Sequence, residues 1–254
     1  MNIEFKKPSP HLHVHHLPAT QPNDVCFVWA HGWMRSHRDF ITIANQLTAC
    51  GDHYLIDLPG HGETSKSCGN WCVEEYLKPI ASWVNSLDKP IIWVGHSFGC
   101  RIGLHMARLL PEKIHSLHLI CPPFNYKNYL SSQFLKKILY KTIYRAGLFL
   151  GLPREKLISI FGSKDYQSAK ALRVMLSNWL NDDTKATVSK ITVPIYLLFG
   201  SHDLETPHQL SQHFLKANPK ANISILNHFD HYTILTDGQH QIIHHLTEHL
   251  GQQT

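Results

Sequence analysis

The feature that most constrains the fold of this chain is a serine enclosed by glycines at the end of a short apolar run. Residues 91–94 (IIWV) resemble a buried strand, residues 95–99 (GHSFG) follow directly, and a helical pattern of apolar residues begins after them. Glycine neighbours make a sharp strand-to-helix turn sterically possible. Such a turn would present the hydroxyl of Ser97 at the carboxyl end of a strand.

An acid and a histidine follow downstream in a matching context. Asp203 comes after the apolar run 195–199 and a short GSH turn, and His231 comes after the run 223–226. The order serine, acid, histidine differs from that of the two common serine protease architectures. We therefore predict a triad in which His231 takes the proton of Ser97 and Asp203 orients the imidazole. His228, three residues before His231, is the alternative base if the loop register differs.

Strands and helices alternate along the first half of the chain. The pattern predicts strands at 11–15 (an outer strand), 25–30, 53–57, 91–95 and 115–121, with helices near 37–49, 73–87 and 97–109. The C-terminal part adds strands near 195–199 and 223–226 and a helix near 234–250. This alternation predicts an α/β fold with a mostly parallel central sheet and helices on both faces. Ligands of such folds bind beyond the carboxyl ends of the strands, where all the motif residues lie.

The alternation stops at Cys121 and resumes only at Val193. The residues between them show apolar positions at three- and four-residue spacing, which predicts helices. We expect residues 1–121 and 191–254 to form the core and residues 122–190 to form a helical cap or lid over the site. Phe134 and Leu139 of this segment are candidate substrate-binding residues. An ordinary helical pair packed on the sheet is the alternative interpretation.

Four motifs in this order make the chain similar to the α/β-hydrolase superfamily. They are HGW at 31–33, which resembles the oxyanion loop, DLPGHG at 57–62, GHSFG at 95–99, and GSHD at 200–203. The backbone N–H of Phe98, at the start of the elbow helix, is one expected oxyanion donor, and the resemblance implies that of Trp33 as the second. The side chains of Trp33 and Phe98 would then line the acyl pocket. Within the superfamily the chain resembles small carboxylesterases, including pimeloyl-acyl-carrier-protein methyl ester esterases.

Composition predicts a globular protein that needs no metal, cofactor or disulfide framework. Hydrophobic residues make up 43% and charged residues 17% of the 254 residues, and the six cysteines are scattered. No apolar run approaches the ~20 residues that a membrane helix needs, so we expect a cytoplasmic protein. Histidines alternate at 11, 13 and 15, but no third ligand of matching context follows, and we interpret them as a solvated strand face. Most histidines of the C-terminal segment are interpreted in the same way, as solvated residues of a helix.

Basic residues gather in the predicted cap. Residues 122–175 hold ten Lys or Arg against two acidic residues, whereas the whole chain carries a net charge of +5. One interpretation is a solvated helical face. The other is a surface that steers an acidic partner toward the cleft, such as acyl carrier protein or an anionic lipid head group. Its candidate residues are Lys136, Lys137, Lys141 and Arg145. No nucleic-acid recognition motif accompanies these charges.

The residue in the strand-to-helix turn, Ser97, decides between reaction types. A serine favours acyl transfer to water, whereas displacement chemistry in the superfamily uses an aspartate at that place. The leading hypothesis is a serine esterase that cleaves a short to medium acyl ester, and an ester carried on acyl carrier protein is a candidate substrate. A thioesterase or a carbon–carbon bond hydrolase on the same triad is the alternative. A non-catalytic ligand-binding relative is a third hypothesis, although such proteins usually lose a triad residue.

Overall fold

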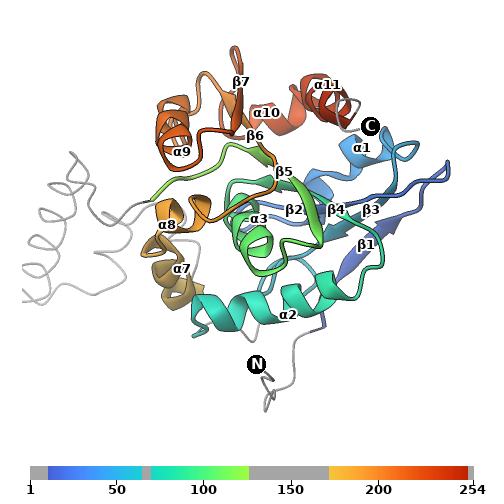
Figure 1. The fold of residues 1–254 in the computed structure, drawn as a ribbon, viewed down its shortest axis with the longest axis horizontal. Coiled ribbons are helices and arrows are strands. Elements are labelled where there is room, and N and C mark those ends of the chain that lie inside the picture. Colours follow the sequence, from blue (N-terminus) through green and yellow to red (C-terminus); the bar gives the residue numbers. More distant parts are fainter. Residues whose placement is uncertain (1–10, 65–69, 126–171, 251–254) are drawn as a thin grey trace, which may run out of the picture.

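The strands form a single open sheet that is parallel except at one edge (Figure 1). The computed structural model describes residues 11–64, 70–125 and 172–250. Within them the strands are β1 (Val14–Leu17), β2 (Cys26–Ala30), β3 (Asp52–Ile56), β4 (Ile91–His96), β5 (Ile114–Ile120), β6 (Ile195–Gly200) and β7 (Asn222–Leu226). Their order in the sheet is β1-β3-β2-β4-β5-β6-β7, and only β1 runs antiparallel to its neighbour. The predicted α/β class with a mostly parallel sheet is confirmed.

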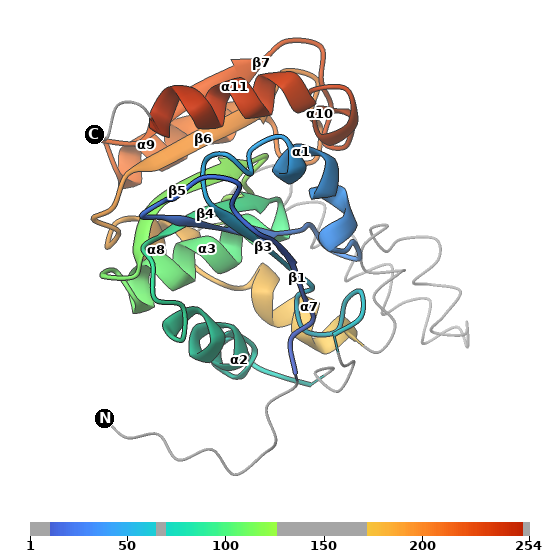
Figure 2. The same cartoon turned by 90° about the vertical axis from the view of Figure 1, so that its right-hand side faces the viewer.

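Helices cover both faces of this sheet (Figure 2). One face carries α2 (Val73–Asn85), α3 (Phe98–Leu109), α7 (Arg173–Leu180), α8 (Thr184–Val188) and α9 (Ser211–Ala217), which follows the single-turn helix η3 (His208–Leu210). The other carries α1 (Ile41–Asn45), α10 (Thr233–Thr236) and α11 (Gln239–Leu250). The first four residues of β4 are all apolar because both faces of the strand are buried. Ile91 and Trp93 pack in the hydrophobic core on the α3 side of the sheet, and Ile92 and Val94 pack in the core on the α11 side.

Two predicted helices differ from those observed. The helix expected at 37–49 is a single turn, η1 (His37–Asp39), followed by the short α1. The side chain of Asp57 binds both the backbone N–H and the ring of His37, which holds this turn apart from α1. The helix expected at 234–250 is divided into α10 and α11 at Gly238, where an added Cβ would lie 2.5 Å from the Ile234 carbonyl oxygen.

The predicted cap lies mostly outside the described residues. Residues 126–171, which include Phe134, Leu139 and the four basic candidates, are among those not described, so the division into core and cap stays a prediction. The described C-terminal end of the predicted cap, residues 172–190, packs on α3. Arg101 Nη1 of α3 lies 3.5 Å from the Trp179 carbonyl oxygen, and His105 Nε2 lies 2.9 Å from Asp182 Oδ2. In the described part of the chain, none of the helices has the length and apolar character to cross a membrane.

Candidate active site

Ser97 lies in a strained turn between β4 and α3. Its φ is +48°, a conformation that residues other than glycine rarely adopt, and such strain is common at functional sites. The neighbouring backbones leave no room for a side chain at Gly95, where an added Cβ would lie 2.7 Å from the backbone of Gly99. The Ser97 N–H donates to the Ile120 carbonyl at 2.9 Å, which ties the turn to β5. The strand, turn and helix predicted around this serine are present.

Asp203 and His231 form a buried pair. His231 Nδ1 lies 2.7 Å from Asp203 Oδ2, and the two side chains are 5% and 0% exposed. The backbone N–H groups of Glu205 and Thr206 each donate to Asp203 Oδ1 at 2.8 Å, and the Thr206 hydroxyl donates to Oδ2 at 2.8 Å. Burial alone would raise the pKa of Asp203, but the hydrogen bonds from His231 and Thr206 outweigh it and lower the pKa to about 2. The carboxylate is therefore ionised at neutral pH.

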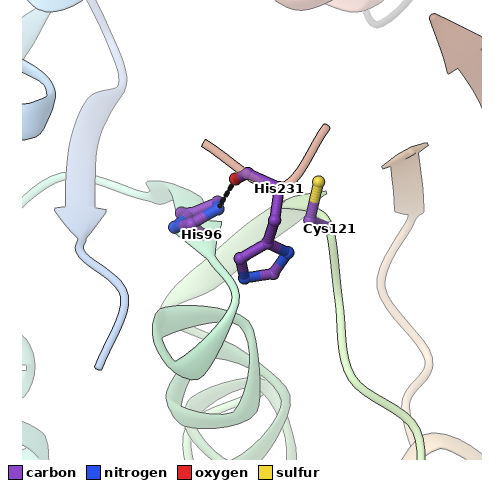
Figure 3. Close-up of side chains that lie close together, drawn as sticks. All are labelled: His96, Cys121 and His231. Carbon is purple, nitrogen blue, oxygen red and sulfur yellow. Dashed lines mark hydrogen bonds between the residues drawn. The ribbon is translucent and has the colours of Figure 1, made fainter. Parts of the chain in front are cut away.

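The last residue of β4 connects the serine turn to the histidine loop. His96 Nε2–H donates to the His231 carbonyl oxygen at 2.9 Å, and the two rings lie 4.8 Å apart between centroids (Figure 3). Burial, followed by the nearby His231, lowers the pKa of His96 to about 3, so its ring is neutral. The structure thus places the residue before Ser97 against His231.

The second imidazole nitrogen of His231 faces a different acid. Nε2 lies 3.7 Å from Glu205 Oε2, and within the described residues the Ser97 hydroxyl makes no hydrogen bond to the ring. Hydrogen bonds between catalytic groups are often long until substrate is bound. The structure therefore brings Asp203 and His231 together directly. It links Ser97 to them through the side chain of the preceding residue, His96, which donates to the His231 backbone carbonyl.

The HGW segment lies against the serine turn. A Cβ on Gly32 would lie 2.8 Å from His96 Nδ1 and 3.6 Å from Ser97 Cβ, so only glycine fits this approach without movement. His31 connects this segment to the loop after β3. Its Nδ1–H donates to the Gly32 carbonyl at 2.7 Å, and its Nε2 accepts the Leu58 N–H at 3.1 Å. Among the described residues, the backbone N–H groups of Trp33 and Phe98 have no hydrogen-bond acceptor.

Aromatic rings from three elements surround the start of α3. Phe98 contacts Trp33 edge-on at 5.1 Å, Tyr76 of α2 at 5.8 Å and Trp179 of α7 at 5.3 Å between centroids. Trp33 and Phe98 are therefore neighbours, and their predicted role in an acyl pocket stays a prediction. Sequence analysis missed Tyr76 and Trp179, because neither lies in a motif and their contact with Phe98 depends on how α2 and α7 pack.

The alternative base lies elsewhere. His228 is exposed, its φ is +71°, and its ring packs against His202 at 5.5 Å. Its N–H donates to Ser201 Oγ at 2.9 Å. Asp230 is also turned away from the ring, since it accepts the backbone N–H groups of Tyr232 and Thr233. In this loop only His231 contacts Asp203, within the part of the chain that the structure describes.

Known proteins resemble this chain over most of its length. The model of the alpha/beta hydrolase family matches residues 27–249. A 3-hydroxybutyrate-oligomer hydrolase from Cupriavidus necator is 27% identical over 56% of this chain and 46% of its own length. A pimeloyl-[acyl-carrier protein] methyl ester esterase from Chromobacterium violaceum is 26% identical over 89% of this chain and 94% of its own length. The chain thus spans less than half of the first relative and nearly all of the second.

Solved structures share the fold at low sequence identity. A thermophilic esterase from Thermogutta terrifontis with malate bound superposes with a TM-score of 0.70 at 15% identity, covering 96% of this chain and 94% of that one. Identity this low supports the shared fold and leaves the chemistry to be argued from the residues themselves.

Proposed function

Since the chain belongs to the alpha/beta hydrolase family, we propose that it is a serine hydrolase that cleaves a carboxylic ester through an acyl-enzyme intermediate. The observation that carries this proposal is the buried contact of 2.7 Å between Asp203 and His231 beside a turn that holds Ser97 at positive φ. An ionised carboxylate on Nδ1 keeps the proton on that nitrogen, so Nε2 retains the lone pair that a general base needs.

In the proposed reaction, Ser97 Oγ attacks the acyl carbonyl while His231 Nε2 accepts the hydroxyl proton. Asp203 stabilises the imidazolium, which then protonates the departing alcohol oxygen. Water, deprotonated by the same nitrogen, attacks the acyl-serine and releases the acid and the free serine hydroxyl. His231 Nε2 must form a hydrogen bond with the Ser97 hydroxyl during this cycle, and the exposed side chain of Glu205 beside it can move into solvent.

The negative charge that develops on the carbonyl oxygen needs preorganised donors. We assign this role to the backbone N–H groups of Trp33 and Phe98, since neither has a hydrogen-bond acceptor among the described residues. Each such donor contributes about 3 kcal/mol to stabilising the transition state. Phe98 also begins α3, so the helix dipole adds to the effect.

The substrate class is proposed from the relatives and the charge distribution. The Chromobacterium violaceum relative is named as an esterase of an acyl group on acyl carrier protein, and it matches this chain almost end to end. Acyl carrier protein is acidic, and the predicted cap is the basic part of the chain. A short to medium acyl ester, presented on such a carrier, fits both observations.

Covalent labelling tests the proposed function. We expect a fluorophosphonate to modify the protein once, with the adduct mapped by mass spectrometry to the peptide containing Ser97. A series of p-nitrophenyl esters and matched thioesters then measures acyl length and separates an esterase from a thioesterase. An adduct on another residue, or no adduct alongside measurable esterase activity, would contradict the proposal.

Charge reversal in the predicted cap tests the carrier. We expect the triple variant Lys136→Glu, Lys137→Glu, Lys141→Glu to lose about tenfold in kcat/KM for a carrier-bound ester at low salt, because electrostatic steering accelerates association. Turnover of a small neutral ester should not change, and the difference should shrink as salt rises. A matched control reverses three exposed basic residues outside the predicted cap: Arg108, Lys216 and Lys220. Equal losses on both substrates would remove the steering idea.

A further inference from the structure

Three side chains of metal-binding type that are not part of the proposed triad lie together. His13, His37 and Glu63 each offer one donor atom, and these atoms lie within 4.8 Å of one another. His13 Nδ1 is 3.5 Å from Glu63 Oε2, and the rings of His13 and His37 are 5.0 Å apart between centroids. The residues come from three separate segments: the approach to β1, the turn η1 and the loop after β3.

Asp57 holds two of these residues in place. Its side chain is fully buried, and Oδ1 accepts the backbone N–H of His37 at 2.7 Å. Oδ2 accepts the Glu63 N–H at 2.9 Å and lies 3.0 Å from His37 Nδ1. With its Nδ1–H given to a carboxylate, His37 keeps the lone pair on Nε2. This carboxylate–histidine arrangement is typical of the histidines that bind metals in proteins.

The backbone of His13 is held by the same loop. Its carbonyl oxygen accepts the Asp57 N–H at 2.9 Å, and its N–H donates to Thr64 Oγ1 at 2.8 Å. Thr64 Oγ1 in turn donates to the Asp57 carbonyl at 2.6 Å. The backbones of all three candidate ligands are therefore fixed relative to one another by hydrogen bonds that need no ion.

We propose that His13, His37 and Glu63 form a binding site for Zn²⁺ or a similar divalent transition metal. Two imidazole nitrogens and one carboxylate oxygen are a donor set that zinc uses in proteins, with water in the remaining position. Ligand atoms on a tetrahedral zinc lie about 3.3 Å apart, so the His13–Glu63 pair is already close to the required spacing. The side chains of His13 and Glu63 are 33% and 56% exposed and can rotate to complete the site.

The guanidinium of Arg38 competes with a metal ion for Glu63 and so lowers the affinity of the proposed site for metal. Arg38 Nη2 lies 3.8 Å from Glu63 Oε1, although this arginine is 75% exposed and its side chain can swing into solvent. The ring of His15 stacks on His37 at 5.5 Å and covers one side of the cluster. The site does not depend on the proposed hydrolase function, since none of its residues belongs to the proposed triad.

Zinc titration of the metal-free full chain, prepared without a histidine tag, tests the proposal. Isothermal titration calorimetry with a competing chelator should reveal one Zn²⁺ bound at least tenfold more tightly than any other. We expect His13→Ala and Glu63→Gln to weaken this site at least tenfold, since each removes one ligand. His244→Ala, at an exposed histidine of α11, is the matched control and should bind as the wild type does.

A second measurement separates a built site from scattered surface histidines, of which this chain of 21 histidines has many. Saturating Zn²⁺ should raise the Tm of the wild type and His244→Ala and leave that of His13→Ala unchanged. Circular dichroism without metal checks that each variant folds. Binding of equal affinity and stoichiometry in wild type, His13→Ala and Glu63→Gln would overturn the proposal, as would weak binding that does not saturate.

Discussion

Replacing Ser97 with alanine should abolish ester hydrolysis. Without the hydroxyl no acyl-enzyme can form, and we expect kcat to fall at least about ten-thousand-fold, toward the residual rate that oxyanion stabilisation and binding alone sustain. The positive φ of residue 97 strains alanine and serine alike, so the change should leave the fold and the Tm nearly unaltered. The measurement is the rate on the best p-nitrophenyl ester, together with fluorophosphonate labelling.

The matched control is Ser86→Ala, at an exposed serine that directly follows α2 and whose hydroxyl donates to the nearby Trp83 carbonyl. This variant should keep wild-type activity. If Ser97→Ala retained more than about a tenth of the wild-type rate, Ser97 would not be the nucleophile and the proposed mechanism would be wrong.

The central strands could be predicted because most of their residues are buried between the helices of the two faces. Runs that are wholly or mostly apolar predicted strands at 25–30, 53–57, 91–95 and 115–121, and the observed strands β2 to β5 agree with them to within two residues. A strand of a parallel sheet covered on both sides is mostly apolar, and β2 and the first four residues of β4 show this as unbroken runs. Strands β3 and β5 also contain histidines, so there the run is interrupted.

The helix boundaries were harder to predict, because contacts far along the chain decide them. The sequence pattern over 37–49 is helical, yet Asp57 binds His37 from twenty positions away and fixes a separate turn there. No local sequence pattern predicts the contact between Asp57 and His37. The same carboxylate brings Glu63 beside His13 and His37, which explains why sequence spacing offered no third ligand for the alternating histidines.

The order of residues along the chain predicts some members of the site, and the others depend on how the chain packs. An acid and a histidine that both follow parallel strands were expected at one edge of the sheet, and Asp203 and His231 do lie there in contact. Thr206 and Glu205 were not anticipated, since they act through a turn whose shape the sequence does not reveal. The distance between His231 and Ser97 also depends on side-chain rotation, which no spacing rule describes.

Replacing Asp203 with asparagine should cost nearly as much activity as losing the serine. Asparagine keeps the shape of the carboxylate, and its carbonyl oxygen can still accept the N–H groups of Glu205 and Thr206. Its amide would then donate to His231 Nδ1, which moves the ring proton to Nε2. That tautomer cannot accept the proton of Ser97, and we expect a fall in kcat of about ten-thousand-fold.

In the Asp203→Asn variant, Glu205 should further stabilise the inactive tautomer of His231. Its Oε2 lies 3.7 Å from His231 Nε2, so a proton on that nitrogen gains a carboxylate partner once an asparagine amide occupies the other side of the ring. The double variant Asp203→Asn, Glu205→Gln should therefore recover part of the lost activity relative to Asp203→Asn alone. Asp230→Asn is the matched control, because Asp230 adjoins the histidine yet caps the backbone of Tyr232 and Thr233, and it should cost little. Steady-state kinetics on one ester compares all three variants, and a loss at Asp230→Asn equal to that at Asp203→Asn would show that the orienting acid has been misassigned.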